Sequence, residues 1–347
     1  MESVTLKMKE KEAMKNITIS DIAAKAGVSK ATVSRVLNTP DKVEEGTRKK
    51  VRQIMKEEQY IPSATARNLS KRVSSTIGVI VPEISNAFFG ELFQGIEGVI
   101  SKNNLSLFYS SHEDDMTRDF QALEMMRMQR VRGVLYIPAV NYPAIGKMKT
   151  IQRRLESLGC PVVCMDRDIG LHLDTIHFDD EKAMKQAVVS LAEVGHEKIA
   201  IINGNQEENI LASERYNGYL AGMKAAGLKV NKGLVFQGVF KKSYSYLITR
   251  ELLMRDEQPT AVITCNNSMS RGYLQAIYEA KKPHLYTHVS LDKIDMLDLL
   301  GIGHNYIRRD AYELGKKAAE LLIARIAFPE RTVQNVLMEA PLVRETY

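Results

Sequence analysis

The chain has 347 residues, 44% of them hydrophobic, and a formal net charge of +6 at pH 7. Its length exceeds that of one typical domain, so two or three hydrophobic cores are expected. The longest apolar runs have the size of single strands, which excludes a helix that crosses a bilayer, and the N-terminal residues lack the apolar stretch of a secretory signal. We therefore expect a cytoplasmic protein without a membrane partner.

Three cysteines, Cys160, Cys164 and Cys265, are scattered along the chain. Each lies in an apolar, strand-like context, so we expect buried free thiols and no disulfide framework. Cys160 and Cys164 lack a second pair of ligands with zinc-site spacing. The sequence therefore predicts no metal and no cofactor.

The positive charge is concentrated near the N-terminus. Residues 15–72 contain thirteen lysines and arginines against six aspartates and glutamates, which leaves the remainder of the chain close to neutral. A cationic segment attached to a neutral body is typical of a protein that binds the phosphate backbone of nucleic acids.

Residues 18–38 fit two short helices joined by a tight turn. The first helix begins at Thr18 or Ser20, whose hydroxyl can accept amide hydrogens, and Gly27 permits the positive φ of the turn. Ser29 is expected to cap the second helix. That helix is predicted to bury Val33, Val36 and Leu37. Its predicted outer face carries Lys30, Ala31, Thr32, Ser34 and Arg35.

This outer face suits the major groove of DNA, because an arginine can fork onto guanine, hydroxyls can bind phosphates, and an alanine or threonine methyl can contact thymine. Residues 18–38 alone would also fit an ordinary helical hairpin. A third amphipathic helix is predicted at Val43–Glu58, and the sequence Tyr60-Ile-Pro62 ends it. A short basic segment of small residues follows at 63–72. The three helices together favour a helix-turn-helix domain.

From residue 76 onward, apolar strand-sized runs alternate with amphipathic helical segments, the pattern of parallel sheets covered by helices. The predicted strands span residues 77–81, 105–109, 133–137, 162–165, 175–178, 198–202, 234–236, 261–264 and 288–291. The predicted helices span residues 88–102, 116–129, 142–158, 181–194, 212–226, 243–255, 269–279 and 310–327. The last helix is expected to bury Tyr312, Leu314, Ala318, Leu321, Leu322 and Ile326.

Residues 18–72 closely resemble the headpiece and hinge helix of the LacI/GalR family of bacterial transcription regulators. The matching residues are Val28-Ser29, Thr32-Val33-Ser34-Arg35-Val36, Asn38, Thr47-Arg48, Tyr60-x-Pro62 and Ala66-x-x-Leu69. The resemblance implies a homodimer whose two headpieces bind a pseudo-palindromic operator. Segments 63–70 would become helices in the minor groove, with Leu69 wedged into the central base step. The implied DNA-binding residues are Thr18, Ser29, Lys30, Ala31, Thr32, Ser34, Arg35, Asn38, Ala66 and Leu69.

The remainder resembles the periplasmic-binding-protein-like core of the same family, two doubly wound parallel-sheet subdomains with a ligand cleft between them. In that fold the chain crosses between subdomains three times, here expected near Thr175, Asn305 and Glu330. The expected divisions are a flexible leader at 1–15, a helix-turn-helix domain at 16–62, a hinge helix and linker at 63–75 and a core at 76–347. The core would divide into subdomain one, about 76–175 and 306–330, and subdomain two, about 176–305 and 331–347.

The resemblance also implies which residues bind an effector in the cleft. Arg215, in a sequence similar to the family's Arg-x-x-Gly, would fork onto hydroxyls or a carboxylate of the ligand. The expected effector-binding residues are Phe88, Phe89, Asp166, Arg215, Phe240, Asn266 and Asp295. His196, in the family's Gly-His pair, is expected to be structural.

One wall of the cleft departs from the family pattern. Asn266-Asn267 stands where the family usually has Asn-Asp, and Arg308-Arg309 replaces a glutamine-proline pair. The usual crossover sequence becomes His304-Asn-Tyr-Ile307. The acid that follows the preceding strand is taken as Asp295, with Asp292 as the alternative. These departures put a plain sugar-binding role in doubt.

The sequence therefore predicts a nucleoid-associated transcriptional regulator, most often a repressor in this family, of carbohydrate or catabolic genes. Its effector would be a sugar, sugar phosphate or sugar acid. One alternative is control by a phosphocarrier protein without a small inducer, as in the catabolite-control members of the family. A remoter alternative is a sugar-processing enzyme with a DNA-binding head. We expect no enzyme, because no nucleophile elbow, phosphate loop or paired strand-end carboxylates are recognisable.

Overall fold

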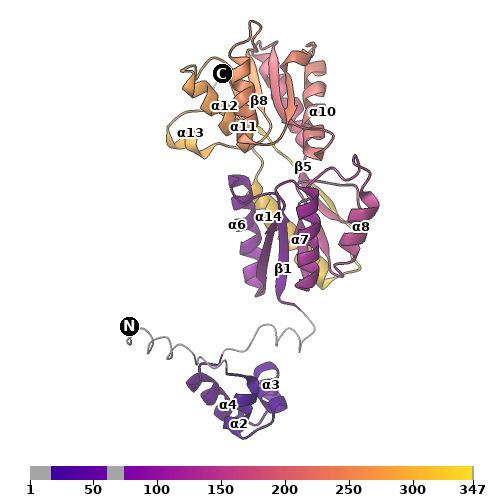
Figure 1. Ribbon diagram of the computed structural model, residues 1–347, viewed down its shortest axis with the longest axis vertical. Helices are drawn as coiled ribbons and strands as arrows, with labels where there is room; N and C mark the ends of the chain where they lie inside the picture. Colours follow the sequence, from indigo (N-terminus) through magenta and orange to yellow (C-terminus); the bar gives the residue numbers. More distant parts are fainter. Residues whose placement is uncertain (1–16, 61–73, 346–347) are drawn as a thin grey trace, which may run out of the picture. The chain divides into compact units, whose positions relative to one another are not determined.

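The computed structural model describes residues 17–60 and 74–345, which belong to two compact units, a headpiece up to Val73 and a core from Ser74 (Figure 1). The predicted leader at 1–15 and the predicted hinge helix at 63–70 lie outside the described residues.

The headpiece contains α2 (Ile19–Ala26), α3 (Lys30–Asn38), a 3-10 turn η2 (Pro40–Lys42) and α4 (Glu45–Glu57). Thr18 precedes α2, and its backbone N–H and its hydroxyl both donate to the Asp21 carboxylate, at 2.8 and 2.7 Å. Gly27 ends α2 with φ +65°, as the tight turn requires. The Ser29 hydroxyl then accepts from the Thr32 backbone N–H at 3.1 Å and caps α3. These local hydrogen bonds define the predicted helix-turn-helix.

The headpiece has its own small hydrophobic core. The buried residues are Ile22, Ala23, Ala26, Val33, Val36 and Val51. Leu37, predicted to be inside, is 36% exposed. That prediction was wrong, because α3 contributes Val33 and Val36 to this core and Leu37 is not among the residues packed against it.

Lobe 1 of the core consists of residues 74–178 together with α14 and β11. Its sheet is parallel and has the order β11-β5-β4-β3-β1-β2. Its strands are β1 (Thr76–Val81), β2 (Ser106–Ser111), β3 (Gly133–Tyr136), β4 (Val162–Met165), β5 (Asp174–Phe178) and β11 (Asn335–Met338). Its helices are α6 (Ala87–Ile100), α7 (Met116–Met128), α8 (Met148–Glu156) and α14 (Ala311–Ala327), with a 3-10 turn η3 (Ser101–Asn103).

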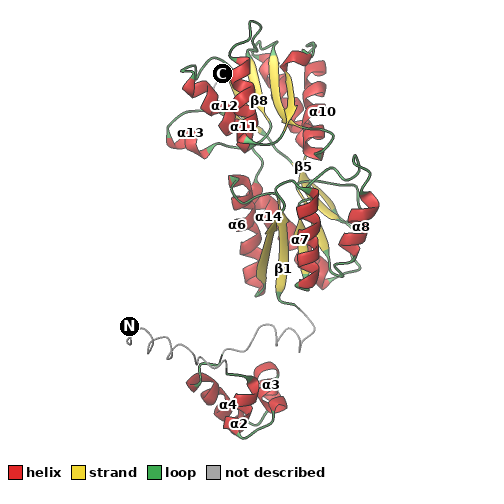
Figure 2. Ribbon diagram, in the orientation of Figure 1, coloured by secondary structure: helices red, strands yellow, loops and turns green. Residues whose placement is uncertain are grey.

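Lobe 2 consists of residues 180–307 together with β12. Its sheet has the order β12-β10-β9-β8-β6-β7, and it is parallel except for the β10–β12 pair. Its strands are β6 (Ile199–Gly204), β7 (Val235–Gly238), β8 (Ala261–Thr264), β9 (Thr287–Leu291), β10 (Asn305–Ile307) and β12 (Leu342–Val343). Its helices are α9 (Asp180–Glu193), α10 (Ile210–Ala225), α11 (Lys242–Leu252), α12 (Asn267–Glu279) and α13 (Asp295–Leu299), with a 3-10 turn η4 (Lys232–Leu234). Helices flank the strands in both lobes (Figure 2).

Two of the three crossings between lobes lie within a few residues of the expected positions, and the third lies later in the chain than expected. The first follows β5 at Phe178, because Thr175 lies inside a strand paired with β4 and β11. The second follows β10 at Ile307, and the third lies between Met338 and Leu342. Residues 331–338 therefore belong with lobe 1 rather than with the second subdomain, since β11 pairs with β5.

Close helix contacts depend on glycine. A Cβ atom at Gly95 in α6 would lie 2.1 Å from the Tyr312 carbonyl oxygen in α14, and one at Gly315 would lie 2.1 Å from the Leu92 oxygen. The backbones of α6 and α14 thus meet directly. Tyr312, predicted to be buried, is instead 44% exposed, because the glycines bring backbone rather than side chain to this contact.

One predicted helix is shorter in the structure, and four short elements were not predicted. The helix predicted at 142–158 is shortened to α8, since Gly146 has φ +66° and Pro143 precedes it. Helix α13 and strands β10, β11 and β12 were not predicted individually. All four are short, and two to five residues carry little periodic signal.

Candidate DNA-binding face and interlobe cleft

The outward face of α3 carries the residues predicted for base contact. Lys30, Ala31 and Arg35 are exposed, and Thr32 and Ser34 are half-buried, while Val33 and Val36 point into the headpiece core. Ser29 and Thr32 also share a 2.9 Å hydrogen bond between their hydroxyls. The face therefore combines a guanidinium, an ammonium group and small side chains, which are the groups that bind base edges in the major groove.

Other predicted DNA-binding residues flank this face or cannot be placed. Thr18 is exposed and its hydroxyl is bonded to Asp21. Asn38 is the last residue of α3, and its side chain lies outside the described part of the chain. Ala66 and Leu69 also lie outside the described residues.

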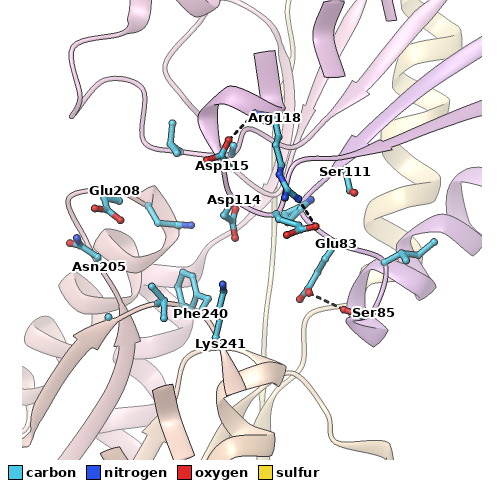
Figure 3. A pocket seen from close by; sticks show the side chains of 18 of the residues that line it. Glu83, Ser85, Ser111, Asp114, Asp115, Arg118, Asn205, Glu208, Phe240 and Lys241 are labelled. Atoms are coloured by element: carbon cyan, nitrogen blue, oxygen red, sulfur yellow. Dashed lines mark hydrogen bonds and ion pairs between the residues drawn. The ribbon is translucent and has the colours of Figure 1, made fainter. Parts of the chain in front are cut away.

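A cavity of about 760 Å³ opens between the lobes, beyond the carboxyl ends of β1 and β2 on one side and β6 and β7 on the other (Figure 3). This is the position at which open parallel sheets receive ligands. The polar and charged lining residues labelled in Figure 3 are Glu83, Ser85, Ser111, Asp114, Asp115, Arg118, Asn205, Glu208 and Lys241. The backbone of Asn141 in lobe 1 also donates to the Glu208 carbonyl in lobe 2 at 2.7 Å.

Charges on the lobe 1 wall are partly paired. Arg118 lies 2.5 Å from Glu113, and the buried Arg167 lies 2.7 Å from Asp114. Arg167 also donates to the carbonyl oxygens of Pro138 and Ala139. This wall is therefore a fixed polar surface of hydroxyl, carboxylate and guanidinium groups.

Of the seven residues predicted to bind an effector, Phe240 alone lines this cavity. Its ring also contacts Arg215, whose guanidinium carbon is 5.7 Å from the ring centroid. The other lining residues were not predicted. Ser111 is the last residue of β2 and Asn205 follows β6, so the rule that ligands lie at the carboxyl ends of strands would have indicated both.

Behind the cavity lies a buried charge cluster, formed by Asp166, Asp180, Arg215, Asp292 and Arg309. Arg215 is 2% exposed; its Nε donates to Asp180 Oδ2 at 2.7 Å, and its Nη1 donates to the Cys265 carbonyl at 2.7 Å. Among the described residues, Arg215 Nη2 and Asp180 Oδ1 have no hydrogen-bond partner.

Arg309 is the centre of the cluster. It binds Asp292 through two hydrogen bonds of 2.8 and 2.7 Å and donates to Asp166 at 3.2 Å. Burial acts to lower the pKa of Arg309, but the Asp292 and Asp180 carboxylates outweigh it and raise that pKa. Burial raises the pKa of the Asp166 carboxyl, against the opposing effect of Arg309. Sequence reasoning noted Arg309 as a departure from the family pattern without assigning it to the site.

The two predicted phenylalanines are buried rather than open to the cavity. Phe88 stacks beneath Arg309, with the guanidinium carbon 4.4 Å from the ring centroid. Phe89 packs edge-on against Phe88 at 5.3 Å. Both belong to the hydrophobic core, so Phe88 contacts the charge cluster and Phe89 supports it.

Asn266 and Asp295 are not members of the charge cluster, although Asn266 directly follows Cys265, whose carbonyl accepts from Arg215. The Asn266 side chain caps α12 by accepting from the Met269 backbone N–H at 2.7 Å, and Asn267 reaches Asn86 in lobe 1 at 3.3 Å. Asp295 is exposed in α13. The alternative acid, Asp292, is the one in the cluster, because it directly follows β9 and its φ of +70° turns the chain there.

His196 and the cysteines have structural surroundings. His196 Nδ1 lies 3.0 Å from the Thr260 hydroxyl, after the positive-φ Gly195 that ends α9. Cys164 and Cys265 are buried free thiols, as predicted, and Cys160 is half-buried.

Comparison with known proteins identifies the family. Residues 18–63 match the bacterial regulatory proteins of the lacI family, and residues 74–346 match the periplasmic binding proteins and sugar binding domain of the LacI family. The chain belongs to the LacI family. The predicted helix-turn-helix headpiece and two-lobed α/β core are thereby confirmed, and the protein is a DNA-binding transcriptional regulator by family.

This LacI-family chain has curated relatives along nearly its whole length. It is 27% identical over 329 residues to catabolite control protein A of Priestia megaterium, covering 94% of this chain and 97% of that protein. It is 31% identical over 331 residues to the ribose operon repressor of Escherichia coli K12, covering 94% and 98%. The names of these relatives are those of transcriptional regulators.

A solved structure of the lac repressor dimer bound to operator and the anti-inducer ONPF shares the fold. Its TM-score is 0.81 at 23% identity, covering 95% of this chain and 98% of that one. Within residues 17–60 and 74–345, no helix is long and apolar enough to cross a membrane.

Proposed function

We propose that this LacI-family chain is a repressor of carbohydrate or catabolic genes that binds a pseudo-palindromic operator as a cytoplasmic, nucleoid-associated homodimer. The observation that carries the proposal is the outer face of α3, where Lys30, Ala31 and Arg35 are exposed. The helix itself is fixed by its N-terminal cap and by the side that it buries in the headpiece core. Relatives named for catabolite control and for the ribose operon support the regulated pathway.

In this proposal the face of α3 enters the major groove, with Arg35 on a base edge and Lys30, Ala31, Thr32 and Ser34 setting the preferred sequence. Further contacts to the phosphates and the minor groove would come from Thr18, Ser29, Asn38, Ala66 and Leu69. Some acidic headpiece residues are already paired: Lys25 lies 2.6 Å from Glu58, and Lys49 lies 3.0 Å from Glu45. Such pairing lowers the repulsion that phosphates would meet.

The direct test is quantitative binding of the full chain to duplexes taken from upstream of its own gene and the adjacent genes. The proposal expects one duplex to bind at least about 10³-fold more tightly than random DNA at physiological salt. Equal affinity for all duplexes, with the same salt dependence, would contradict a sequence-specific regulator.

The interlobe cavity is the proposed effector site. Phe240 offers an aromatic floor, and Ser111, Asn205 and Lys241 offer donors and acceptors suited to an oxygen-rich ligand such as a sugar, sugar phosphate or sugar acid. The Nη2 of Arg215, next to the Phe240 ring and without a hydrogen-bond partner among the described residues, is available to a ligand group that reaches it. Asp166 and Phe88 would act through Arg309, while Phe89, Asn266 and Asp295 have at most supporting positions. A ligand that favours one lobe arrangement would change DNA affinity by linkage.

Thermal unfolding with a panel of these three ligand classes tests the site. A binding member should raise the melting temperature of the wild type, and Phe240→Leu should abolish that rise. Phe328→Leu, at an exposed position of lobe 1, is the matched control and should keep it. An unchanged response in Phe240→Leu would contradict the assignment of this cavity.

A second mode of control is favoured by one observation. Arg215 and Asp166 already have internal partners in the charge cluster, which is what a regulator without a small inducer would need. Control by a phosphocarrier protein would then be expected. In the same thermal assay this alternative predicts no shift with any sugar and a shift only with the phosphorylated carrier.

A further inference from the structure

We propose that Arg309 is a built-in ligand of the interlobe cleft, whose guanidinium fills the carboxylate pocket behind the cavity and fastens the two lobes in one arrangement without an added small molecule. The operator affinity of the ligand-free chain then depends on Arg309. The use of operator affinity as a readout rests on the proposed function. The fixed arrangement of the lobes does not rest on it.

One guanidinium joins groups from both lobes. Arg309 lies at the crossing between β10 of lobe 2 and α14 of lobe 1. It forks onto Asp292, which follows β9 in lobe 2, through Nε and Nη2 at 2.8 and 2.7 Å. Its remaining nitrogen, Nη1, lies 3.2 Å from Asp166 in lobe 1 and 3.9 Å from Asp180 in lobe 2. All three nitrogens of the group are therefore directed at carboxylates.

Aromatic rings complete the enclosure. The guanidinium carbon lies 4.4 Å from the centroid of Phe88 and 5.6 Å from that of Phe178. The side chain of Arg309 is 4% exposed. A forked carboxylate on the edge and rings on the face are the contacts by which proteins hold a bound guanidinium compound.

The acids that receive Arg309 are held in uncommon backbone conformations. Asp166 has φ +61° and Asp292 has φ +70°, in the left-handed region that non-glycine residues seldom occupy. Each acid immediately follows a strand, and the two strands belong to different sheets. Such conformations persist only where the surroundings fix them, and here both direct a carboxylate to the same cation.

Arg309 balances the negative charge of carboxylates from both lobes. The cluster contains three carboxylates and two guanidinium groups. Removing Arg309 would leave Arg215 as the remaining cation of the cluster, with Arg167 also acting on Asp166, so the like charges of Asp166, Asp180 and Asp292 on opposite lobes would repel more strongly. Buried ionic networks often contribute little net stability, so the role inferred for Arg309 is to position the lobes rather than to stabilise the fold.

Chemical rescue tests this role in the full chain. Arg309→Ala should weaken operator binding at least about tenfold, and methylguanidinium at about 10 mM should restore it to within about twofold, since it can refill the pocket. Methylammonium at the same concentration should not, because it lacks the fork. Arg308→Ala, the exposed neighbour, should bind like the wild type. Wild-type operator affinity in Arg309→Ala, or no effect of methylguanidinium, would overturn the proposal.

Should Arg309→Ala fail to fold, the neutral pair Asp292→Asn with Arg309→Gln keeps two hydrogen-bonding groups in place. Loss of operator affinity in this folded double variant supports the proposal, and retention overturns it.

If neither variant folds, the arrangement of the lobes is measured in a chain that keeps Arg309. Spin labels on Met128→Cys and Leu247→Cys, both exposed positions, with Cys160→Ser and with the labelled chain diluted in excess unlabelled chain so that only distances within one chain are measured, should give one narrow interlobe distance without ligand. A broad or two-peaked distribution would overturn the proposal even if no operator exists.

Discussion

The sequence indicated that Arg215 is important, but it indicated only part of the role of this residue. Its sequence context indicated a ligand-binding arginine, yet its Nε and Nη1 are bonded to Asp180 and the Cys265 carbonyl. Because Asp180 faces Arg309 as well, Arg215 supports the whole charge cluster. Its substitution should therefore affect folding as well as ligand binding.

We predict that Arg215→Ala lowers the free energy of unfolding by about 3–5 kcal/mol, because Asp180 is left as a buried charge without its nearest cation. Urea denaturation followed by circular dichroism measures the change. Arg271→Ala, on an exposed face of α12, should change the stability by less than about 0.5 kcal/mol. An equally small decrease in the free energy of unfolding of Arg215→Ala would show that the cluster does not depend on the pair of Arg215 and Asp180.

Glu214 should make stability depend on pH. Burial, together with the Asp180 carboxylate, raises the pKa of Glu214 from 4.5 to about 8. Between these values the folded chain keeps a proton that the unfolded chain has released, so stability falls as pH rises from about 4.5 to 8. Glu214→Gln should remove on the order of 2 kcal/mol of that fall. The exposed Glu197→Gln should leave the profile unchanged, and parallel profiles for wild type and Glu214→Gln would contradict the assignment.

Arg35 is the residue on which sequence reading by α3 most depends. We predict that Arg35→Ala costs about 1–3 kcal/mol of operator affinity and relaxes the preference at one symmetric operator position. Lys56→Ala, on α4, should weaken all DNA binding slightly without changing the preference. An Arg35 variant with unchanged affinity and preference would show that another face of the headpiece reads the bases.

At the scale of elements, the predictable parts were those with long periodic patterns. Most predicted helices and strands agree with the structure to within a few residues, because their apolar residues recur at helical or strand spacing. The exceptions are the helix predicted at 142–158, which is shortened to α8, and the short elements α13, β10, β11 and β12, of which the last two are placed by pairing with strands distant in sequence. Strand β11, for example, is defined by its pairing with β5, some 160 residues earlier.

The α6–α14 contact is an element-scale feature that substitution can test. Gly95→Ala would place a Cβ against the backbone of α14, 2.1 Å from an oxygen and 2.8 Å from a nitrogen. We predict a loss of about 3 kcal/mol of stability, since two backbones must separate. Gly90→Ala, in the same helix with nothing within 4 Å, should stabilise by about 0.5–1 kcal/mol. Equal effects of the two substitutions would mean that the helices do not approach through Gly95.

At the scale of the whole molecule, the sequence was sufficient to predict a helix-turn-helix headpiece and a two-lobed α/β core. It was not sufficient for the cleft. The cavity lining comes from the end of β2 and from loops after β1, β2, β3, β6 and β7, and only their spatial convergence distinguishes them from other polar loops. Arg309 could be seen as unusual in sequence, but its partners Asp166 and Asp292 come from different lobes and required the fold.

The central claim is that the headpiece face on α3 makes this LacI-family protein a sequence-specific regulator. Selection of binding sites from random duplex DNA by the full chain tests it most directly, with Arg35→Ala selected in parallel. We predict enrichment of one pseudo-palindrome by the wild type, and relaxed sequence at one symmetric position in the variant. A wild-type pool that stays random through successive rounds, although the chain still binds DNA, would contradict the claim.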